Sequence, residues 1–130
     1  MNFKIDTKEK FTVITPLAVQ NAAIMTAELE EFLISNLHKT PPHIVLNLKE
    51  VSSLTPDEAG KIAEIQQQYY AHGHSFVICE MNEEVTSVFN NLSLEAPLNI
   101  TPTESEAWDM IQMEEIEREL LDGFDEQENQ

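Results

Sequence analysis

Residues 43–62 read HIVLNLKEVSSLTPDEAGKI, and this stretch decides the fold. Its first part contains a short and nearly continuous apolar run, formed by Ile44, Val45, Leu46 and Leu48. A run of this kind is typical of a β-strand that is covered on both faces, as in a parallel sheet. The stretch therefore predicts a buried strand that leads directly into a helix.

The second part of the stretch predicts a helix that begins at Pro56 and extends to about Ala71. Thr55 is a suitable N-cap, and Pro56 suits the first helical position because no hydrogen bond is needed from its nitrogen there. Glu58 follows the cap by three residues and completes a capping box. Asp57 lies in the same first turn, where it can stabilise the helix through the macrodipole or occupy a functional position.

Strands and helices alternate on both sides of this stretch. The other elements are recognised from apolar residues at strand or helix spacing. Their ends are marked by cap residues such as Asn21 and Thr103 and by the helix-breaking segment Thr40-Pro41-Pro42. We expect strands at 3–5, 11–14, 75–81 and 98–101, and helices at 22–39, 83–92 and from 104 onward. The order β-β-α-β-α-β-α-β-α predicts a single α/β domain, with a mixed, mostly parallel sheet of four to five strands and about four helices.

The chain is strongly acidic, with 130 residues, 24 acidic against 7 basic side chains and a formal net charge of −17. Nucleic acid and anionic membrane surfaces would be repelled, whereas a basic protein partner would be attracted; the acidity can also serve only to keep the domain soluble. Eleven acidic residues and a single basic one, Arg118, fall between Glu104 and Gln130. We expect residues 1–122 to form the domain and residues 123–130 an acidic disordered tail.

No segment approaches the ~20 apolar residues of a membrane span, and no signal peptide is recognisable. The single cysteine, Cys79, cannot form an internal disulfide and lies in a predicted buried strand, so we expect a cytoplasmic protein. The three glycines, at 60, 73 and 123, do not form a phosphate-binding motif. His72 and His74 form a poor metal site, because no other ligand lies near them in sequence. We expect no enzyme activity, no metal and no cofactor.

Polar residues gather where the central strand gives way to the helix: Ser52, Ser53, Thr55, Asp57 and Glu58. In parallel α/β folds, functional sites are built from the loops that follow strands. These residues can equally serve only to turn the chain and to cap the helix. Chemistry alone leaves both interpretations open.

Three stretches resemble the STAS domain family of anti-sigma-factor antagonists, over roughly residues 2–113. PLAVQNA at 16–22 is similar to the family segment that precedes its first helix, with Ala18 in place of the usual aspartate. IVLNLKEVSSLTPDEAGKI at 44–62 is similar to the family's hydrophobic strand and the signature that follows it, in which Val51, Leu54 and Gly60 match. HGHSFVICEMNEEVTSVFNNLSL at 72–94 is similar to the family's next strand and helix. The resemblance implies a STAS-like fold.

In this family, a serine or threonine at the start of the second helix is phosphorylated by a kinase that is also an anti-sigma factor, and phosphorylation blocks binding. The alignment places Asp57 at this phosphoacceptor position, with Thr55, Pro56 and Glu58 replacing the usual aspartate, serine and glycine. Asp57 cannot accept a serine-type phosphoester and carries a permanent negative charge. Thr55 and Ser53 are alternative acceptors, of which Thr55 is a poor one because its hydroxyl caps the helix.

The resemblance thus implies a regulatory protein-binding domain in a partner-switching system that controls transcription in the manner of bacterial signalling. Its partner would be an anti-sigma factor or a serine-kinase-like ATPase, and no phosphorylation is expected at Asp57. The expected binding face combines the loop 52–55 with the residues Asn21, Ser53, Thr55, Asp57, Glu58 and Lys61. The long last helix, with Ile111, Ile116 and Leu120, leaves a homodimer open; its alternative is a solubilising tail.

Another class of function stays open from the same resemblance. STAS-like domains also occur in lipid-transport complexes and on anion transporters. The chain could therefore be a stand-alone STAS subunit of a transport or lipid-trafficking complex, or a small-ligand-binding module. The negative charge argues against an anionic ligand.

Overall fold

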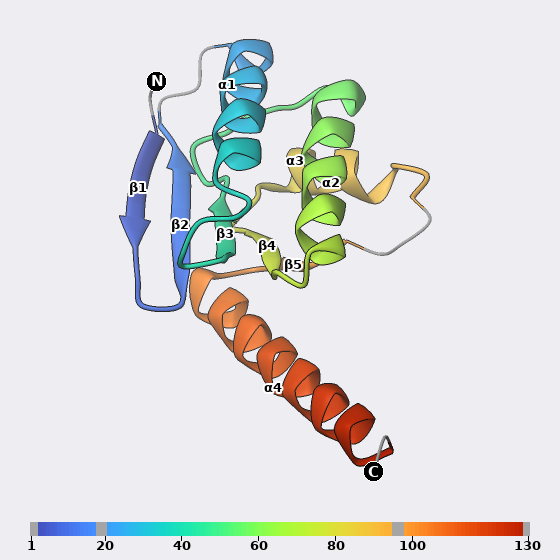
Figure 1. The fold of residues 1–130 in the computed structure, drawn as a ribbon. Helices are drawn as coiled ribbons and strands as arrows, with labels where there is room; N and C mark the ends of the chain where they lie inside the picture. Colours follow the sequence, from blue (N-terminus) through green and yellow to red (C-terminus); the bar gives the residue numbers. More distant parts are fainter. Residues whose placement is uncertain (1–2, 18–20, 95–97, 129–130) are drawn as a thin grey trace.

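The computed structural model describes residues 3–17, 21–94 and 98–128 of the chain. Strands and helices follow the predicted order (Figure 1). The strands are β1 (Phe3–Thr7), β2 (Phe11–Pro16), β3 (His43–Asn47), β4 (Phe76–Cys79) and β5 (Ile100–Thr101), and the helices are α1 (Ala22–Ser35), α2 (Pro56–Ala71), α3 (Glu83–Asn90) and α4 (Glu104–Glu128).

The strands form one mixed sheet in the order β1-β2-β3-β4-β5. The hairpin of β1 and β2 is antiparallel, and each following strand lies parallel to its neighbour. In the centre of the sheet, Val13 of β2 lies beside Val45 of β3, which lies beside Val77 of β4. The predicted α/β class and the mostly parallel sheet are confirmed.

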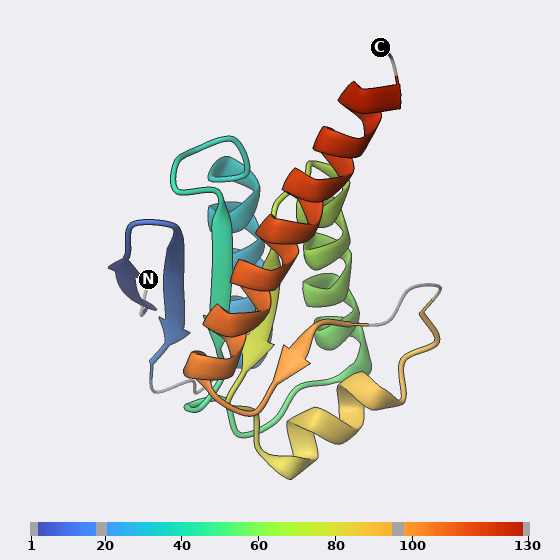
Figure 2. The ribbon, with the colours of Figure 1, turned by 90° about the horizontal axis from the view of Figure 1, so that it is seen from below.

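The sheet is covered on both faces (Figure 2). Because successive strand residues point to opposite faces, alternate positions enter different cores. Ile14, Leu46 and Ile78 pack in the larger core with α1 and α2, and Val45 and Val77 pack against α4 in the smaller one. All five side chains are fully buried. The continuous apolar run of β3 is thus explained by helices on both sides of it.

Helices α1 and α2 lie side by side on the first face of the sheet (Figure 1). A buried hydrogen bond of 2.7 Å joins them, in which the hydroxyl of Tyr69 donates to the carbonyl of Leu33. That carbonyl lies in the last turn of α1, where intrahelical donors run out. The bond therefore fixes the spacing of the two helices that begin at the candidate site.

Most element boundaries differ from the sequence predictions by one or two residues, and the ends of α1 and α4 differ by more. Helix α1 ends at Ser35, before Thr40-Pro41-Pro42, because Asn36 closes the turn with a 2.7 Å side-chain bond to the carbonyl of Phe32. Helix α4 continues past Gly123 to Glu128, whereas the sequence predicted a disordered tail from residue 123. Residues 129 and 130 of the predicted tail lie outside the described residues, and the division into domain and tail stays a prediction. In the described part of the chain, no helix is both long and apolar enough to span a membrane.

Candidate functional site

The loop between β3 and α2 is anchored by its apolar residues and exposes its polar ones. Val51 and Leu54 are buried in the larger core, with 1% and 6% of their surface accessible. Ser52 and Ser53 between them are exposed. The loop therefore presents its hydroxyl groups at a defined place, because the residues on each side are held by packing.

The start of α2 has the predicted capping box. The backbone N–H of Glu58 donates to the Thr55 hydroxyl over 3.2 Å, and the N–H of Thr55 donates to the Glu58 carboxylate over 2.8 Å. The Thr55 hydroxyl and the Glu58 carboxylate thus both have a structural task. Among the expected site residues of this turn, Asp57 has no such task.

Asp57 is exposed in the first turn of α2. No hydrogen bond or ion pair joins its carboxylate to another residue in the part of the chain that the structure describes. Lys61 lies one turn further along the same face and is also exposed. Beside them, a Cβ added to Gly60 would meet no atom within 4 Å. With respect to the described residues, this face of α2 therefore offers a carboxylate and an ammonium group that have no hydrogen-bond or ion-pair partner, with open space beside Gly60.

Asn82 attaches the same loop to α3. Its side-chain amide donates to the carbonyl of Ser52 over 3.0 Å, while its side-chain oxygen accepts from the N–H of Val85 over 2.8 Å. The second bond makes Asn82 the N-cap of α3. Because one side chain serves both, the loop after β3 and the start of α3 are positioned together.

Asn21 lies at the same end of the sheet as Asp57. Its side chain caps α1 by accepting from the N–H of Ile24 over 3.1 Å. Helices α1 and α2 run in the same direction, so both of their N-termini lie at the carboxyl edge of the strands (Figure 1). The structure thus places all six predicted site residues at one edge, with the loop and the first turn of α2 in the centre.

A second polar group at this edge was not predicted. The fully buried Asn47, at the end of β3, donates from its amide to the carboxylates of Glu80 (3.1 Å) and Glu104 (2.8 Å). Burial, with the charges of these two glutamates, raises the pKa of the neighbouring Cys79 thiol to about 12, so the thiol is unreactive at neutral pH. The sequence feature that could have revealed this group was the polar Asn47 within an apolar strand.

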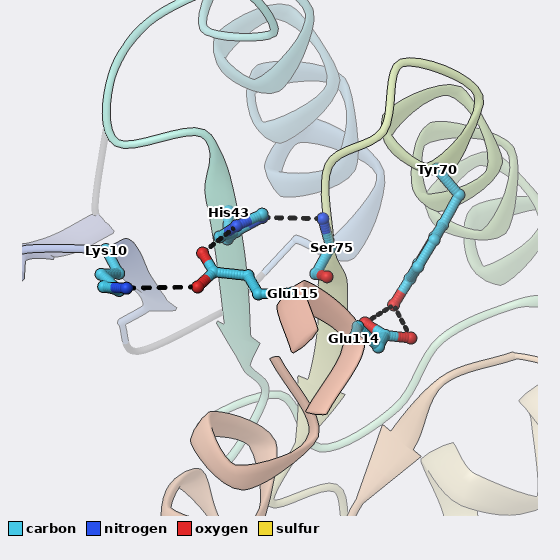
Figure 3. Close-up of polar contacts among 6 residues, drawn as sticks. All are labelled: Lys10, His43, Tyr70, Ser75, Glu114 and Glu115. Atoms are coloured by element: carbon cyan, nitrogen blue, oxygen red, sulfur yellow. Dashed lines mark hydrogen bonds and ion pairs between the residues drawn. The ribbon is translucent and has the colours of Figure 1, made fainter. Parts of the chain in front are cut away.

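A third polar cluster fixes α4 to the opposite edge (Figure 3). The backbone N–H of Ser75 donates to Nδ1 of His43 over 2.9 Å, so Nε2 bears the proton and donates to Glu115 over 2.7 Å. Lys10 also donates to Glu115, over 3.3 Å. Burial lowers the pKa of His43, and the hydrogen bond to Glu115 offsets this only in part. His43 is therefore a neutral link between the sheet and α4.

No metal site emerges at any of these clusters. Within residues 3–17, 21–94 and 98–128, no three His, Cys, Asp or Glu side chains are placed to hold a metal ion. Nδ1 of His72 donates to the carbonyl of Gln68 over 2.8 Å, and the ring of His74 packs near that of Tyr69. These two histidines are separate turn residues.

Comparison with known proteins gives a likeness in structure. No family model and no curated protein matches the sequence. A serine-to-glutamate variant of RsbS from Moorella thermoacetica is similar with a TM-score of 0.72 at 12% identity, over 86% of this chain and 96% of that one. TM1081 from Thermotoga maritima, a candidate anti-sigma factor antagonist, is similar with a TM-score of 0.68 at 23% identity, over 85% of this chain and 94% of that one.

A STAS domain protein from Planctomyces limnophilus is also similar, with a TM-score of 0.66 at 11% identity, over 85% of this chain and 97% of that one. Each of these chains is matched over nearly its whole length. The predicted STAS fold is therefore confirmed.

Proposed function

We propose that this chain, a domain with the STAS fold, is a non-enzymatic regulatory protein that binds a cytoplasmic protein partner in the manner of an anti-sigma-factor antagonist. The observation that supports this most is the first turn of α2. There Asp57 is exposed and free of partners among the described residues, although its neighbours Thr55 and Glu58 are engaged in the capping box. A carboxylate that the fold does not use for hydrogen bonding is available to a partner.

The charge of Asp57 bears on whether phosphorylation controls the interaction. A phosphorylated serine or threonine carries about −1.5 to −2 charges near neutral pH, whereas an aspartate carries about −1. At the N-terminus of α2, that charge is favourable through the helix dipole. The position thus has part of the charge of a phosphorylated residue at all times. We infer that the chain binds its partner without control by phosphorylation at Asp57.

The surface beside Asp57 supports contact with a protein. Lys61 offers a charge of opposite sign on the same face, and the open space at Gly60 permits close approach of another backbone. Ser53 and Asn21 extend the polar surface to the loop and to α1. Direct pairing of both charges with a partner would give orientation as well as attraction. We propose a kinase-like ATPase of the anti-sigma type as this partner.

Affinity capture from native cytoplasm with the full chain tests the proposal. The bait proteins are wild type, Asp57→Ser, Asp57→Lys and the matched control Glu64→Lys, which changes an exposed acidic residue further along α2. We expect wild type and Glu64→Lys to capture the same ATPase, and Asp57→Lys to lose it. With ATP added, mass spectrometry should find phosphate on the serine introduced in Asp57→Ser and none at this position in wild type.

Other outcomes would overturn the proposal in distinguishable ways. Equal capture by Asp57→Lys and wild type would exclude this face as the binding surface. Capture of a transporter subunit in place of an ATPase would support the transport-associated alternative. Phosphate on Thr55 or Ser53 of the wild-type chain would refute the absence of phosphorylation control.

A further inference from the structure

A groove lies along α4, on the side facing β5. It has a volume of about 420 Å³ and is open to solvent. We call it the α4 groove; it is lined by Asn99, Thr101, Glu106, Asp109, Met110, Met113, Glu114 and Glu117. Two methionines provide apolar surface within a border of four carboxylates. The groove shares no residue with the candidate site at the start of α2.

Apolar side chains continue from the groove along the projecting half of α4. Met113, Ile116, Leu120 and Leu121 are 62%, 56%, 65% and 66% exposed, and we call these four the α4 stripe. Their spacing of three, four and one residues places them along one side of the helix. Ala107 and Ile111, which pack on the sheet, are by contrast fully buried. The two figures of the whole fold show this half of α4 extending beyond the sheet (Figures 1 and 2).

The α4 groove is held in a fixed form by contacts on the sheet side of the helix. Glu115 is bound to His43 and Lys10, and Glu114 accepts two hydrogen bonds from the hydroxyl of Tyr70, at 2.8 and 3.0 Å (Figure 3). These contacts lie at the point where α4 leaves the sheet. The groove and the stripe therefore form one continuous surface that does not need to assemble before binding.

The charges on this surface decide what can cover it. Eleven acidic residues and one basic residue fall between Glu104 and Glu128. The one basic residue, Arg118, lies against the ring of Tyr70, with 6.0 Å between its guanidinium carbon and the ring centroid. A second copy of the chain would bring a similar set of carboxylates against this one, and the repulsion would oppose pairing. A positively charged occupant meets no such penalty.

We propose that the α4 groove and the α4 stripe together bind a basic amphipathic helix of a protein partner. Apolar residues of that helix at positions i, i+3, i+4 and i+7 would cover Met113, Ile116 and Leu120, with Met110 at the groove end. Its lysines or arginines would face Glu106, Asp109 and Glu117. Methionine side chains adapt readily to differently shaped apolar anchors, which suits this mode of binding.

The test uses the full chain and a designed peptide of about 18 residues, composed of leucine and lysine with the leucines at helical spacing. A peptide of the same composition in scrambled order is the control for charge alone. Fluorescence anisotropy measures both affinities at physiological salt, where long-range attraction is largely screened. We expect the amphipathic peptide to bind at least about tenfold tighter than the scrambled one, because only its helix presents a continuous apolar face.

Variants then locate the site. Met113→Gln and Leu120→Gln should each weaken binding of the amphipathic peptide about tenfold, because each removes an apolar anchor of the surface. Ile34→Gln, a matched change of an exposed isoleucine on α1, should leave the affinity unchanged. Asp57→Lys should also leave it unchanged, which separates this surface from the one proposed at α2. Amide NMR shifts should gather between Asn99 and Leu121.

Equal binding of the two peptides, or an equal loss in Ile34→Gln and Met113→Gln, would overturn the proposal in favour of nonspecific charge attraction. Sedimentation equilibrium of the chain alone tests whether a second copy of the chain covers this surface instead. A monomer agrees with the proposal. A dimer that Leu120→Gln converts to monomer would overturn it, because the surface would then be covered by a second copy.

Discussion

Gly60 and Gly73 offer a matched pair of substitutions that should change stability in opposite directions. At both positions an added Cβ would meet no atom within 4 Å, so neither substitution creates a clash. They differ in backbone conformation, since Gly73 has a φ of +76° and Gly60 lies in the regular part of α2. The difference between the two alanine variants therefore measures backbone conformation with little contribution from packing.

The expected magnitudes follow from these conformations. Glycine in a helix interior is less favourable than alanine by about 0.5–1 kcal/mol, so Gly60→Ala should stabilise the fold by that amount. At Gly73, the left-handed conformation of α2's C-terminal turn opposes a Cβ, so Gly73→Ala should destabilise by about 1 kcal/mol. With a urea m-value of about 1.5–2 kcal/mol/M, the midpoint should rise by about 0.3–0.6 M in the first variant and fall by about 0.5 M in the second.

Equilibrium urea unfolding followed by circular dichroism measures both midpoints. The m-values should match that of wild type, because neither variant alters the surface exposed on unfolding. A lower midpoint for Gly60→Ala would refute the reasoning, since it would mean that the space beside Gly60 is filled in the folded protein. A stabilised Gly60→Ala that also binds its partner more weakly would agree with the proposed contact at this face.

Three further predictions concern the hydrogen bonds that hold the elements together. Tyr69→Phe should lower the free energy of unfolding by about 1–3 kcal/mol, because the buried carbonyl of Leu33 loses its donor; thermal or urea unfolding measures this, and an unchanged midpoint would contradict it. Thr55→Ala should cost about 1 kcal/mol through loss of the capping box, while Thr55→Ser should retain most of the stability, as urea midpoints would show. Burial keeps the pKa of His43 below its ordinary 6.5, so the unfolded chain binds more protons than the folded one in mildly acidic solution. The contribution of neutral His43 to the free energy of unfolding should therefore be fully present above about pH 6.5 and should decrease as the pH falls below it. Unfolding midpoints at about pH 7.5 and about pH 5.5 test this, and a difference of the same size in His43→Gln would exclude His43 as its source.

Local features of the fold were predictable because they depend on residues that are close in sequence. The alternation of strands and helices follows from apolar spacing, and the capping box of Thr55 and Glu58 involves residues three apart. The αL conformation of Gly73 follows in the same way from its place after α2. At the end of α4, a scarcity of apolar residues predicted disorder after Gly123, and the division into domain and tail stays a prediction. Glutamate and leucine, which favour helices, are frequent before that point, and the helix continues to Glu128.

The candidate site was only partly predictable, because some of its contacts join residues that are distant in sequence. The sequence identified Asp57 and its neighbours as candidates, because their position follows from one strand end and one helix start. It did not reveal the bond from Asn82 to the carbonyl of Ser52, which joins residues 30 apart. Nor did it reveal the cluster around His43, whose link to Glu115 spans 72 residues. Both depend on how elements that are distant along the chain pack against one another.

The sequence by itself determined the order of the elements, the capping box of α2, the burial of β3 and the carboxylate in the first turn of α2. Only the tertiary structure decided that α4 covers the face of the sheet opposite α1 and α2, and that its projecting half leaves Met113 and Leu120 exposed. Hydrogen bonding and periodicity act between residues a few positions apart and can be recognised along the chain. Which apolar faces meet is decided by burial of the whole set of elements together, and this can be observed only once they are packed.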